Sequence, residues 1–307
     1  MKRYPSPTGI FPATIIANSV GNCGVNDPKD VKKLQKSLID AGYILATGRT
    51  LNVDGICGAE LINAIQWVQN LINMPANGMV SPFTLAFFEA LSNIDAQWQP
   101  SYKPGNLNVS IGQYTFDNEG QDIYFIPLRA KRMKYFSRIL HHPDQNSGVT
   151  IGRGFDMKKR SVGNIYNAMR IAGIPEYKCV ICSKASGLYG READQFVSVF
   201  RNMVGEITHQ QQISLFENAY REIVNYASGV YSRAVSKESA ALPWDKLDRK
   251  IRDVFVDTLY QGNSTAWELS RAAMKNDIPA VIEYFRNDPT CIQYESSRQR
   301  IRYLNEA

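Results

Sequence analysis

Three polar residues stand out because their types and spacing could support acid–base chemistry. Glu119 precedes a glycine, and Thr150 and Asp156 flank a later glycine-rich run. If that run is extended, its side chains alternate between two faces, so Thr150 and Asp156 would share one face. Gly152 and Gly154 add no side chain between them, which lets a bulky substrate approach closely. The competing interpretations are a surface charge for Glu119 and a simple chain reversal for the glycines.

The elements that must position these residues are predicted to be mainly helical. Apolar residues recur at helical spacing through most of the C-terminal half, and Thr208 with Gln211 forms a capping box at the start of one such stretch. The expected elements are helices over about 208–227, 251–262, 265–275 and 278–286, and one β-like segment near 148–157. The fold class predicted for this half is α+β, with a small β segment and a large helical lobe.

The N-terminal part shows a weak repeat of two turn–helix units. Asp54-Gly55 and Asn77-Gly78 each form a turn in which glycine supplies a positive φ, and a helix follows each turn. An earlier helix is expected to begin at Asp27-Pro28, an N-cap followed by proline at the first helical position. Ser81-Pro82 is expected to open the third helix. The pattern predicts a small three-helix bundle.

This region, over about residues 19–92, resembles the three-helix peptidoglycan-binding domain. The family pattern is a D-V-x-x-L-Q helix, a D-G-x-x-G turn, an A-I/V-x-x-F-Q helix and a second D-G-x-x-G-P-x-T turn. The matching residues are Asp30, Val31, Leu34, Gln35, Asp54, Gly55, Gly58, Ala64, Ile65, Gln69, Gly78, Pro82 and Thr84, and the departures are Leu61, Val68, Asn77 and Ser81. The resemblance implies peptidoglycan as a partner. Most of these positions build the fold, and Asp54 and Gln35 are the candidate ligand contacts.

A composition change separates the two halves. Residues 96–111 hold prolines, a glycine and polar residues without periodicity, as linkers do. The predicted organisation is therefore a tail over 1–20, a peptidoglycan-binding domain over 21–95, a linker over 96–111 and a second domain over 112–307.

The second domain resembles the lysozyme family of T-even phages and, more closely, its pesticin-like toxin relatives. Those relatives share the pattern E-G … S-G-V-T-I-G-x-G-x-D, present here as Glu119-Gly120 and the run from Ser147 to Asp156. Phe155 stands where the phage enzymes have a histidine. Asp122 lies near, but not at, the position of their second aspartate, so the choice between Asp156 and Asp122 stays open, with Asp156 favoured.

The resemblance implies an N-acetylmuramidase in which Glu119 is the catalytic acid, Thr150 positions water and Asp156 assists. Glycoside cleavage needs one carboxylic acid to protonate the leaving oxygen and a second group to handle water. A partly desolvated pocket must keep Glu119 protonated, and Tyr124 is expected to line that pocket. The geometry implies inversion, with carboxyl groups about 6.5–9.5 Å apart. The chemistry requires no cofactor and no metal.

Composition restricts the partners. The net charge of +6 favours anionic partners such as cell-wall polymers, lipid headgroups or nucleic acid, without choosing between them. The basic residues are scattered, which argues against a nucleic-acid groove. No apolar run suits a membrane span or a signal peptide, so we expect cytoplasmic synthesis and action at the wall of a target bacterium. The sequence leaves open whether Cys23 pairs with Cys57, or Cys179 with Cys182, and it does not give the oligomeric state.

Two routes of delivery and two further functions remain as alternatives. The chain could be a phage endolysin, or an antibacterial effector delivered by a machine such as a type VI secretion system, which would require a periplasmic immunity protein. The toxin-like motif favours the effector. A catalytically inactive wall-binding protein is disfavoured by the intact set of Glu119, Thr150 and Asp156. A chitinase-like glycosidase is disfavoured by the wall-binding region.

Overall fold

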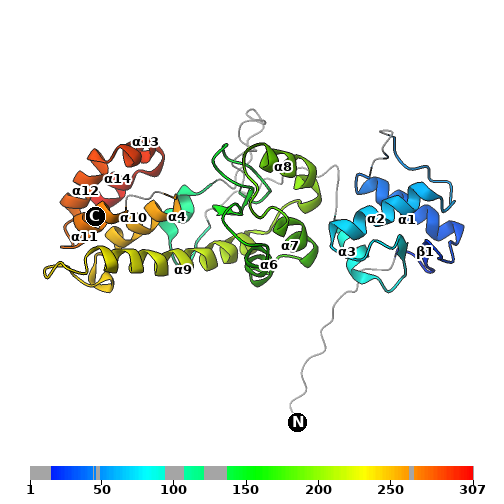
Figure 1. The fold of residues 1–307 in the computed structure, drawn as a ribbon, viewed down its shortest axis with the longest axis horizontal. Coiled ribbons are helices and arrows are strands. Elements are labelled where there is room, and N and C mark those ends of the chain that lie inside the picture. The colour runs from blue at the N-terminus through cyan, green and yellow to red at the C-terminus, as the bar shows by residue number, and fades with distance from the viewer. Residues whose placement is uncertain are drawn as a thin grey trace, which may run out of the picture.

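The computed structural model describes residues 15–43, 45, 49–93, 107–120, 137–262 and 266–306. Within these ranges the chain forms thirteen α-helices and two antiparallel two-stranded sheets. The prediction of a mainly helical fold with small β segments is confirmed. Figure 1 shows three bodies in a row: an N-terminal bundle, a middle lobe and a C-terminal lobe.

The N-terminal bundle is built as its sequence pattern predicts, with one shifted boundary. Its elements are β1 (Val20–Gly21), α1 (Pro28–Asp40), α2 (Ala59–Leu71), β2 (Met79–Val80) and α3 (Leu85–Asn93). Asp27 caps α1 by accepting a hydrogen bond from the backbone N–H of Lys29 at 2.9 Å. The third helix begins at Leu85 rather than at Ser81-Pro82, because Ser81 donates its backbone N–H to Thr84 Oγ1 and forms a turn there.

The middle lobe contains the β-like segment predicted near 148–157, which is a hairpin of two short strands rather than one continuous extended run. The lobe comprises β3 (Thr150–Ile151), β4 (Phe155–Asp156), α6 (Val162–Ile171), α7 (Glu176–Ser183) and α8 (Gly190–Val204). The chain reverses between β3 and β4, where Gly152 and Gly154 have φ of 65° and 74°. Thr150 and Asp156 still share a face, because they are directly paired across the hairpin.

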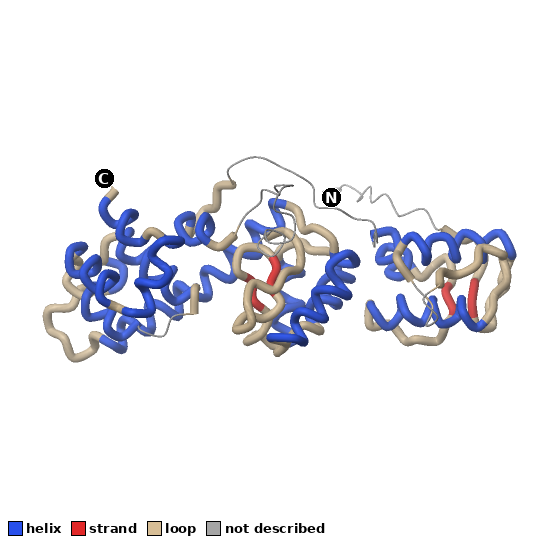
Figure 2. The backbone as a smooth tube through the Cα atoms, turned by 90° about the horizontal axis from the view of Figure 1, so that it is seen from above, coloured by secondary structure: helices blue, strands red, loops and turns tan. Residues whose placement is uncertain are grey.

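Helix α9 (His209–Ala234) joins the two lobes (Figure 2). The predicted capping box of Thr208 and Gln211 is present at its start. The helix continues seven residues beyond the predicted end at 227, because its apolar stripe extends to Ala234. Leu215, in its first half, packs in a core shared with the hairpin, whereas Tyr231 packs in the separate core of the C-terminal lobe.

The C-terminal lobe combines the last helices with one helix from far earlier in the chain. Its elements are α4 (Gln113–Asn118), α10 (Arg249–Tyr260), α11 (Ala266–Ala273), α12 (Ile278–Asn287), α13 (Pro289–Arg298) and α14 (Arg300–Asn305), with a 3-10 helix, η3 (Trp244–Lys246). Helix α4 packs against α10. It is anchored by Phe116, which is fully buried with its ring centroid 5.1 Å from that of Phe216. This packing places the end of α4 beside the hairpin.

The structure shows the state of the cysteines and whether any described helix could span a membrane. Cys23, Cys57, Cys179, Cys182 and Cys291 are free thiols. Cys179 and Cys182 lie in α7, and burial raises the pKa of Cys179 to about 12, which keeps that thiol protonated. No helix of the described ranges is long and apolar enough to cross a membrane.

Candidate active site

A pocket of about 520 Å³ lies where the hairpin of the middle lobe meets α4 and α13 of the C-terminal lobe. Its lining residues are Asp117, Asn118, Glu119, Gly120, His141, Pro143, Thr150, Gly154, Ser297 and Arg298. Three residues singled out from the sequence, Glu119, Thr150 and Gly154, therefore line one pocket. Gly152 and Asp156 are not among the lining residues.

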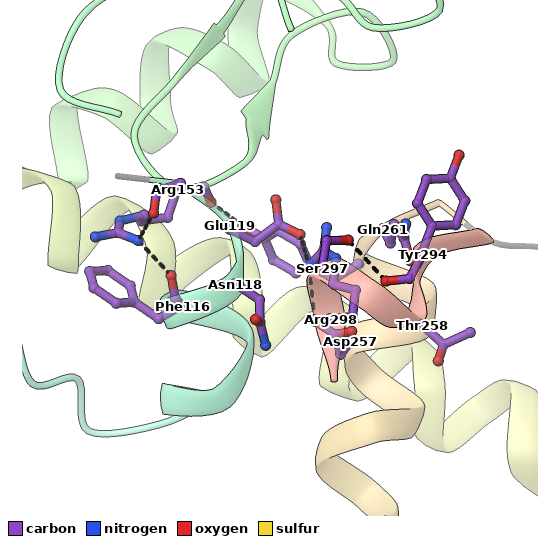
Figure 3. Close-up of polar contacts among 12 residues, drawn as sticks. Phe116, Asn118, Glu119, Arg153, Asp257, Thr258, Gln261, Tyr294, Ser297 and Arg298 are labelled. Atoms are coloured by element: carbon purple, nitrogen blue, oxygen red, sulfur yellow. Dashed lines mark hydrogen bonds and ion pairs between the residues drawn. The ribbon is translucent and has the colours of Figure 1, made fainter. Parts of the chain in front are cut away.

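The backbone around Glu119 is held by the hairpin. Glu119 is the C-cap of α4. Arg153, in the hairpin turn, donates from Nη1 to the carbonyl oxygens of Phe116 at 2.9 Å and of Gly120 at 2.6 Å, on either side of Glu119 (Figure 3). Its guanidinium also lies 4.4 Å from the centre of the Phe116 ring. The two lobes thus meet at the residue predicted to be the acid.

The carboxyl group of Glu119 belongs to a buried cluster of charges. Its Oε1 lies 2.6 Å from Arg298 Nη1, which also lies 3.1 Å from Asp257 Oδ1 (Figure 3). Asp257 is fully buried and is paired with Arg300 at 2.6 Å. Burial raises the pKa of Glu119; the positive charge of Arg298 opposes this shift and the negative charge of Asp257 adds to it.

Gly154 leaves room for the second oxygen of that carboxyl group. A Cβ atom at this position would lie 2.7 Å from Glu119 Oε2 and 2.7 Å from Tyr260 Cε1. Tyr260 donates its hydroxyl to the carbonyl of Arg153 at 2.8 Å, so the turn is also fixed from α10. Glycine is required here both for its positive φ and for the absence of a side chain.

Thr150 and Asp156 are paired in the hairpin but differ in what their side chains reach. Thr150 lines the pocket, and its hydroxyl donates to the carbonyl of Gly148 at 3.2 Å. Asp156 accepts backbone N–H groups with both oxygens, from Gly148 at 2.9 Å and from Lys158 at 2.7 Å. In this structure Asp156 secures the hairpin loop, and its assistance to Glu119 stays a prediction. Asp122 and Tyr124 lie outside the described residues.

Gln35 and Asp54, the candidate wall contacts, hold the first turn together by hydrogen bonds, an arrangement called here a turn lock. The amide nitrogen of Gln35 donates to Asp54 Oδ1 at 2.9 Å and to the carbonyl of Ile56 at 3.2 Å, and its oxygen accepts from Gly55 N at 3.0 Å. Gln35 is only 3% exposed. In this structure its amide is buried and engaged within the fold, and its contact with the wall polymer stays a prediction. Asp54 remains exposed.

Several residues in and around the pocket were not identified as functional from the sequence. Asp257 interrupts the apolar stripe of α10, a signal that could have indicated a buried charge with a partner. His141 and His142 were expected to be surface or packing residues. Both are buried; His141 lines the pocket, and His142 has both ring nitrogens engaged, by Asp194 at 2.7 Å and by the carbonyl of Ser147 at 3.2 Å.

Comparison with known proteins identifies two families along the chain. Residues 27–88 match a peptidoglycan binding domain, so the N-terminal bundle is a peptidoglycan-binding domain. Residues 112–302 match a domain of unknown function (DUF8812). No curated protein matches the chain. Since the second match spans more than half of the 307 residues, the chain belongs to the DUF8812 family and carries a peptidoglycan-binding domain in front of it.

Proposed function

We propose that this protein is a peptidoglycan hydrolase of the lysozyme type, an N-acetylmuramidase in which Glu119 protonates the glycosidic oxygen. One observation carries the proposal: a buried carboxyl group with a raised pKa lines a pocket between two lobes, in a chain that binds peptidoglycan. Perturbed carboxyl groups in pockets are typical of acid–base sites.

The surroundings of Glu119 suit both halves of a proton transfer. Burial favours the neutral acid before the reaction, and the shared position of Arg298 between two carboxyl groups limits how strongly it favours ionisation. Once the proton has left, the carboxylate has a guanidinium 2.6 Å away. The Glu119–Arg298 pair therefore lets Glu119 act as a proton donor that is neither too weak an acid nor permanently ionised.

The hairpin wall of the pocket, which carries Thr150, would position the attacking water. Thr150 lies on the hairpin, whereas Glu119 lies at the end of α4, so a sugar between them would be protonated from one lobe and attacked from the other. This arrangement favours inversion. The pocket volume lies within the range of about 300–1,000 Å³ that is usual for ligand sites.

The direct test is digestion of purified sacculi by the full chain, with mass analysis of the released fragments. We expect N-acetylmuramic acid at the new reducing ends. Glu119→Gln should lower the rate about 10²–10⁴-fold, because the amide cannot donate a proton to the leaving oxygen. Asp117→Asn is the matched control, since this exposed neighbouring carboxylate lines the same pocket. Near-parental clearing by Glu119→Gln would refute the assignment.

We further propose that the enzyme is used against other bacteria, as an effector delivered to the periplasm and held inactive in the producer by a periplasmic inhibitor. The toxin-like run from Ser147 to Asp156 supports this use. A phage endolysin with the same chemistry is the alternative. Fused to an export signal, the chain should lyse a Gram-negative host, whereas the cytoplasmic chain should be tolerated. Equal toxicity in both compartments would indicate a different target.

A further inference from the structure

His141 is fixed directly opposite Thr150 in the wall of the pocket. The two residues form a β-bridge, in which His141 N donates to Thr150 O at 2.9 Å and Thr150 N donates to His141 O at 2.8 Å. His141 is 5% exposed and lines the same pocket as Glu119. Its backbone therefore holds the imidazole beside the threonine that was predicted to position water.

The hydrogen bonds of both side chains leave acceptor sites unused. His141 Nδ1 lies 2.9 Å from the carbonyl oxygen of Ile139. A carbonyl only accepts, so Nδ1 carries the proton, and Nε2 of the neutral ring has a free lone pair. Within the described residues, no second partner of the ring is found. The Thr150 hydroxyl donates to Gly148 O, so its lone pairs are also available.

Asp156, by contrast, is held by the hairpin backbone and does not line the pocket. Both of its oxygens are engaged by backbone N–H groups. We propose that His141 is a catalytic residue: its Nε2 and Thr150 Oγ1 accept the two protons of the attacking water, and Nε2 removes one of them. This inference rests on the proposed function and deepens it.

The step balances as an ordinary hydrolysis. The water oxygen forms a bond to the anomeric carbon while the bond from that carbon to the leaving oxygen breaks. The leaving oxygen takes the proton of Glu119, and Nε2 takes a proton from the water. The products are two sugar hydroxyls, and the imidazolium returns the enzyme to its starting state by losing its proton to solvent while Glu119 regains one.

The electrostatic surroundings keep the imidazole neutral. Burial lowers the pKa of His141 to about 4, and the hydrogen bond to Ile139 opposes this shift. Arg201 and His142 lower the pKa further, whereas Asp156 raises it. Two acidic residues, Asp117 and Glu119, share the pocket with His141. A base with a pKa near 4 has about the proton affinity of a carboxylate, which is the usual base of inverting glycosidases.

The experiment combines two variants with chemical rescue. His141→Ala should lower kcat on sacculi about 10²–10⁴-fold with little change in KM, because base catalysis is lost. Azide attacks without needing a base, so it should restore turnover of His141→Ala and yield a glycosyl azide of inverted configuration. It should not rescue Glu119→Gln, which lacks the acid. His142→Gln is the control, since both ring nitrogens of His142 have partners outside the pocket.

A second readout covers the case in which His141→Ala fails to fold. Nitrogen-15 NMR of the parent imidazole should show the proton on Nδ1 and a titration midpoint near pH 4. A proton on Nε2 would overturn the inference, because that nitrogen could not accept from water. Near-parental activity of His141→Ala, or a folded variant that azide does not rescue, would also overturn it. An inactive parent would instead refute the proposed function and this inference with it.

Discussion

At the scale of single residues, Glu119 is a carboxyl group that the fold buries next to a positive charge. Its ion pair with Arg298 favours the ionised form, but loss of solvent outweighs that attraction, since the pKa of Glu119 is raised. Asp257 explains part of this balance, because it binds the same guanidinium nitrogen of Arg298. The folded protein therefore gains stability from the proton on Glu119.

This balance predicts how the stability of Glu119→Gln depends on pH. A raised pKa in the folded state contributes stability below the unfolded pKa, and that contribution is lost as pH rises through the folded value. Glutamine resembles the protonated acid at every pH. We expect the variant to be more stable than the parent at pH 7, and the two to be similar at pH 3.5. Urea unfolding at both pH values tests this, and a variant that is less stable at pH 7 would show that the Arg298 pair dominates.

Gly154 and Gly152 form a matched pair for testing the close approach to Glu119. Both have positive φ, so alanine at either position should cost about 1–2 kcal/mol of folding stability. Only at Gly154 would the added Cβ lie 2.7 Å from Glu119 Oε2; at Gly152 the nearest atom is Leu215 Cδ2, at 3.5 Å. We therefore expect Gly154→Ala to lose most activity on sacculi and Gly152→Ala to keep it. Similar rates for the two variants would contradict the geometry.

At the scale of elements, the peptidoglycan-binding domain uses the same hydrogen-bond pattern twice: a buried glutamine side chain makes three hydrogen bonds to a turn. In the second turn Gln69 donates to Asn77 Oδ1 at 2.8 Å and to the carbonyl of Met79 at 2.9 Å, and accepts from Gly78 N at 2.9 Å. Gln35 makes the equivalent three bonds in the first turn. The weak repeat in the sequence is therefore a repeat of locked turns, each of which sets the start of a helix or strand.

The two locks should contribute similarly to stability. Gln35→Ala and Gln69→Ala should each lower the free energy of unfolding by about 2–4 kcal/mol, because each leaves buried backbone groups without partners. Gln66→Ala is the control, since Gln66 is less buried and makes one long bond, to Ala76 O at 3.2 Å. Thermal unfolding of the full chain measures the effect. A loss at one lock alone would show that the turns are not equivalent.

Local signals explain which elements could be predicted from the sequence. The cap at Asp27 and the capping box at Thr208 depend on neighbouring residues, and both are present. The choice between an extended run and a chain reversal at Gly152 and Gly154 stayed open, because a glycine-rich run has no side-chain pattern to mark its reversal. The pocket residues from α13, and the buried charge of Asp257 in α10 behind them, depend on tertiary packing. Arg298 reaches Glu119 only because α4 packs against α10, which no local pattern indicates.

At the scale of the whole molecule, the middle lobe is in contact with a neighbour on each side (Figure 1). On one side the pocket lies between it and the C-terminal lobe, where Arg153 and Tyr260 make direct hydrogen bonds across the boundary. On the other side α7 touches α2 and α3 of the peptidoglycan-binding domain. There Lys184 donates to the carbonyl of Asn70 at 2.7 Å. The pocket therefore lies at one interface of the middle lobe, and the peptidoglycan-binding domain contacts the opposite side of that lobe.

This separation predicts that binding and cleavage can be divided. Residues 1–95 alone should sediment with insoluble sacculi, since they contain the whole matched peptidoglycan-binding domain, whose helices α1 and α2 both pack against α3. A fragment over 107–307 should cleave soluble glycan fragments but lose efficiency on intact sacculi. The cut belongs before Leu107, because Gln113 donates to its carbonyl at 3.0 Å and Ser110 is held by Glu217.

Lys184→Ala in the full chain distinguishes a linker-tethered domain from a rigidly docked one. If the domain acts only as a tether, removing the bond to Asn70 should leave both sacculus binding and the cleavage rate within about fivefold of the parent. Exposed contacts of this kind contribute on the order of 1 kcal/mol or less. A large loss of cleavage with intact binding would mean that the docked orientation directs the pocket towards the glycan.

In the separate fragment experiment, failure of residues 1–95 to bind any sacculus would show that wall binding requires the rest of the chain.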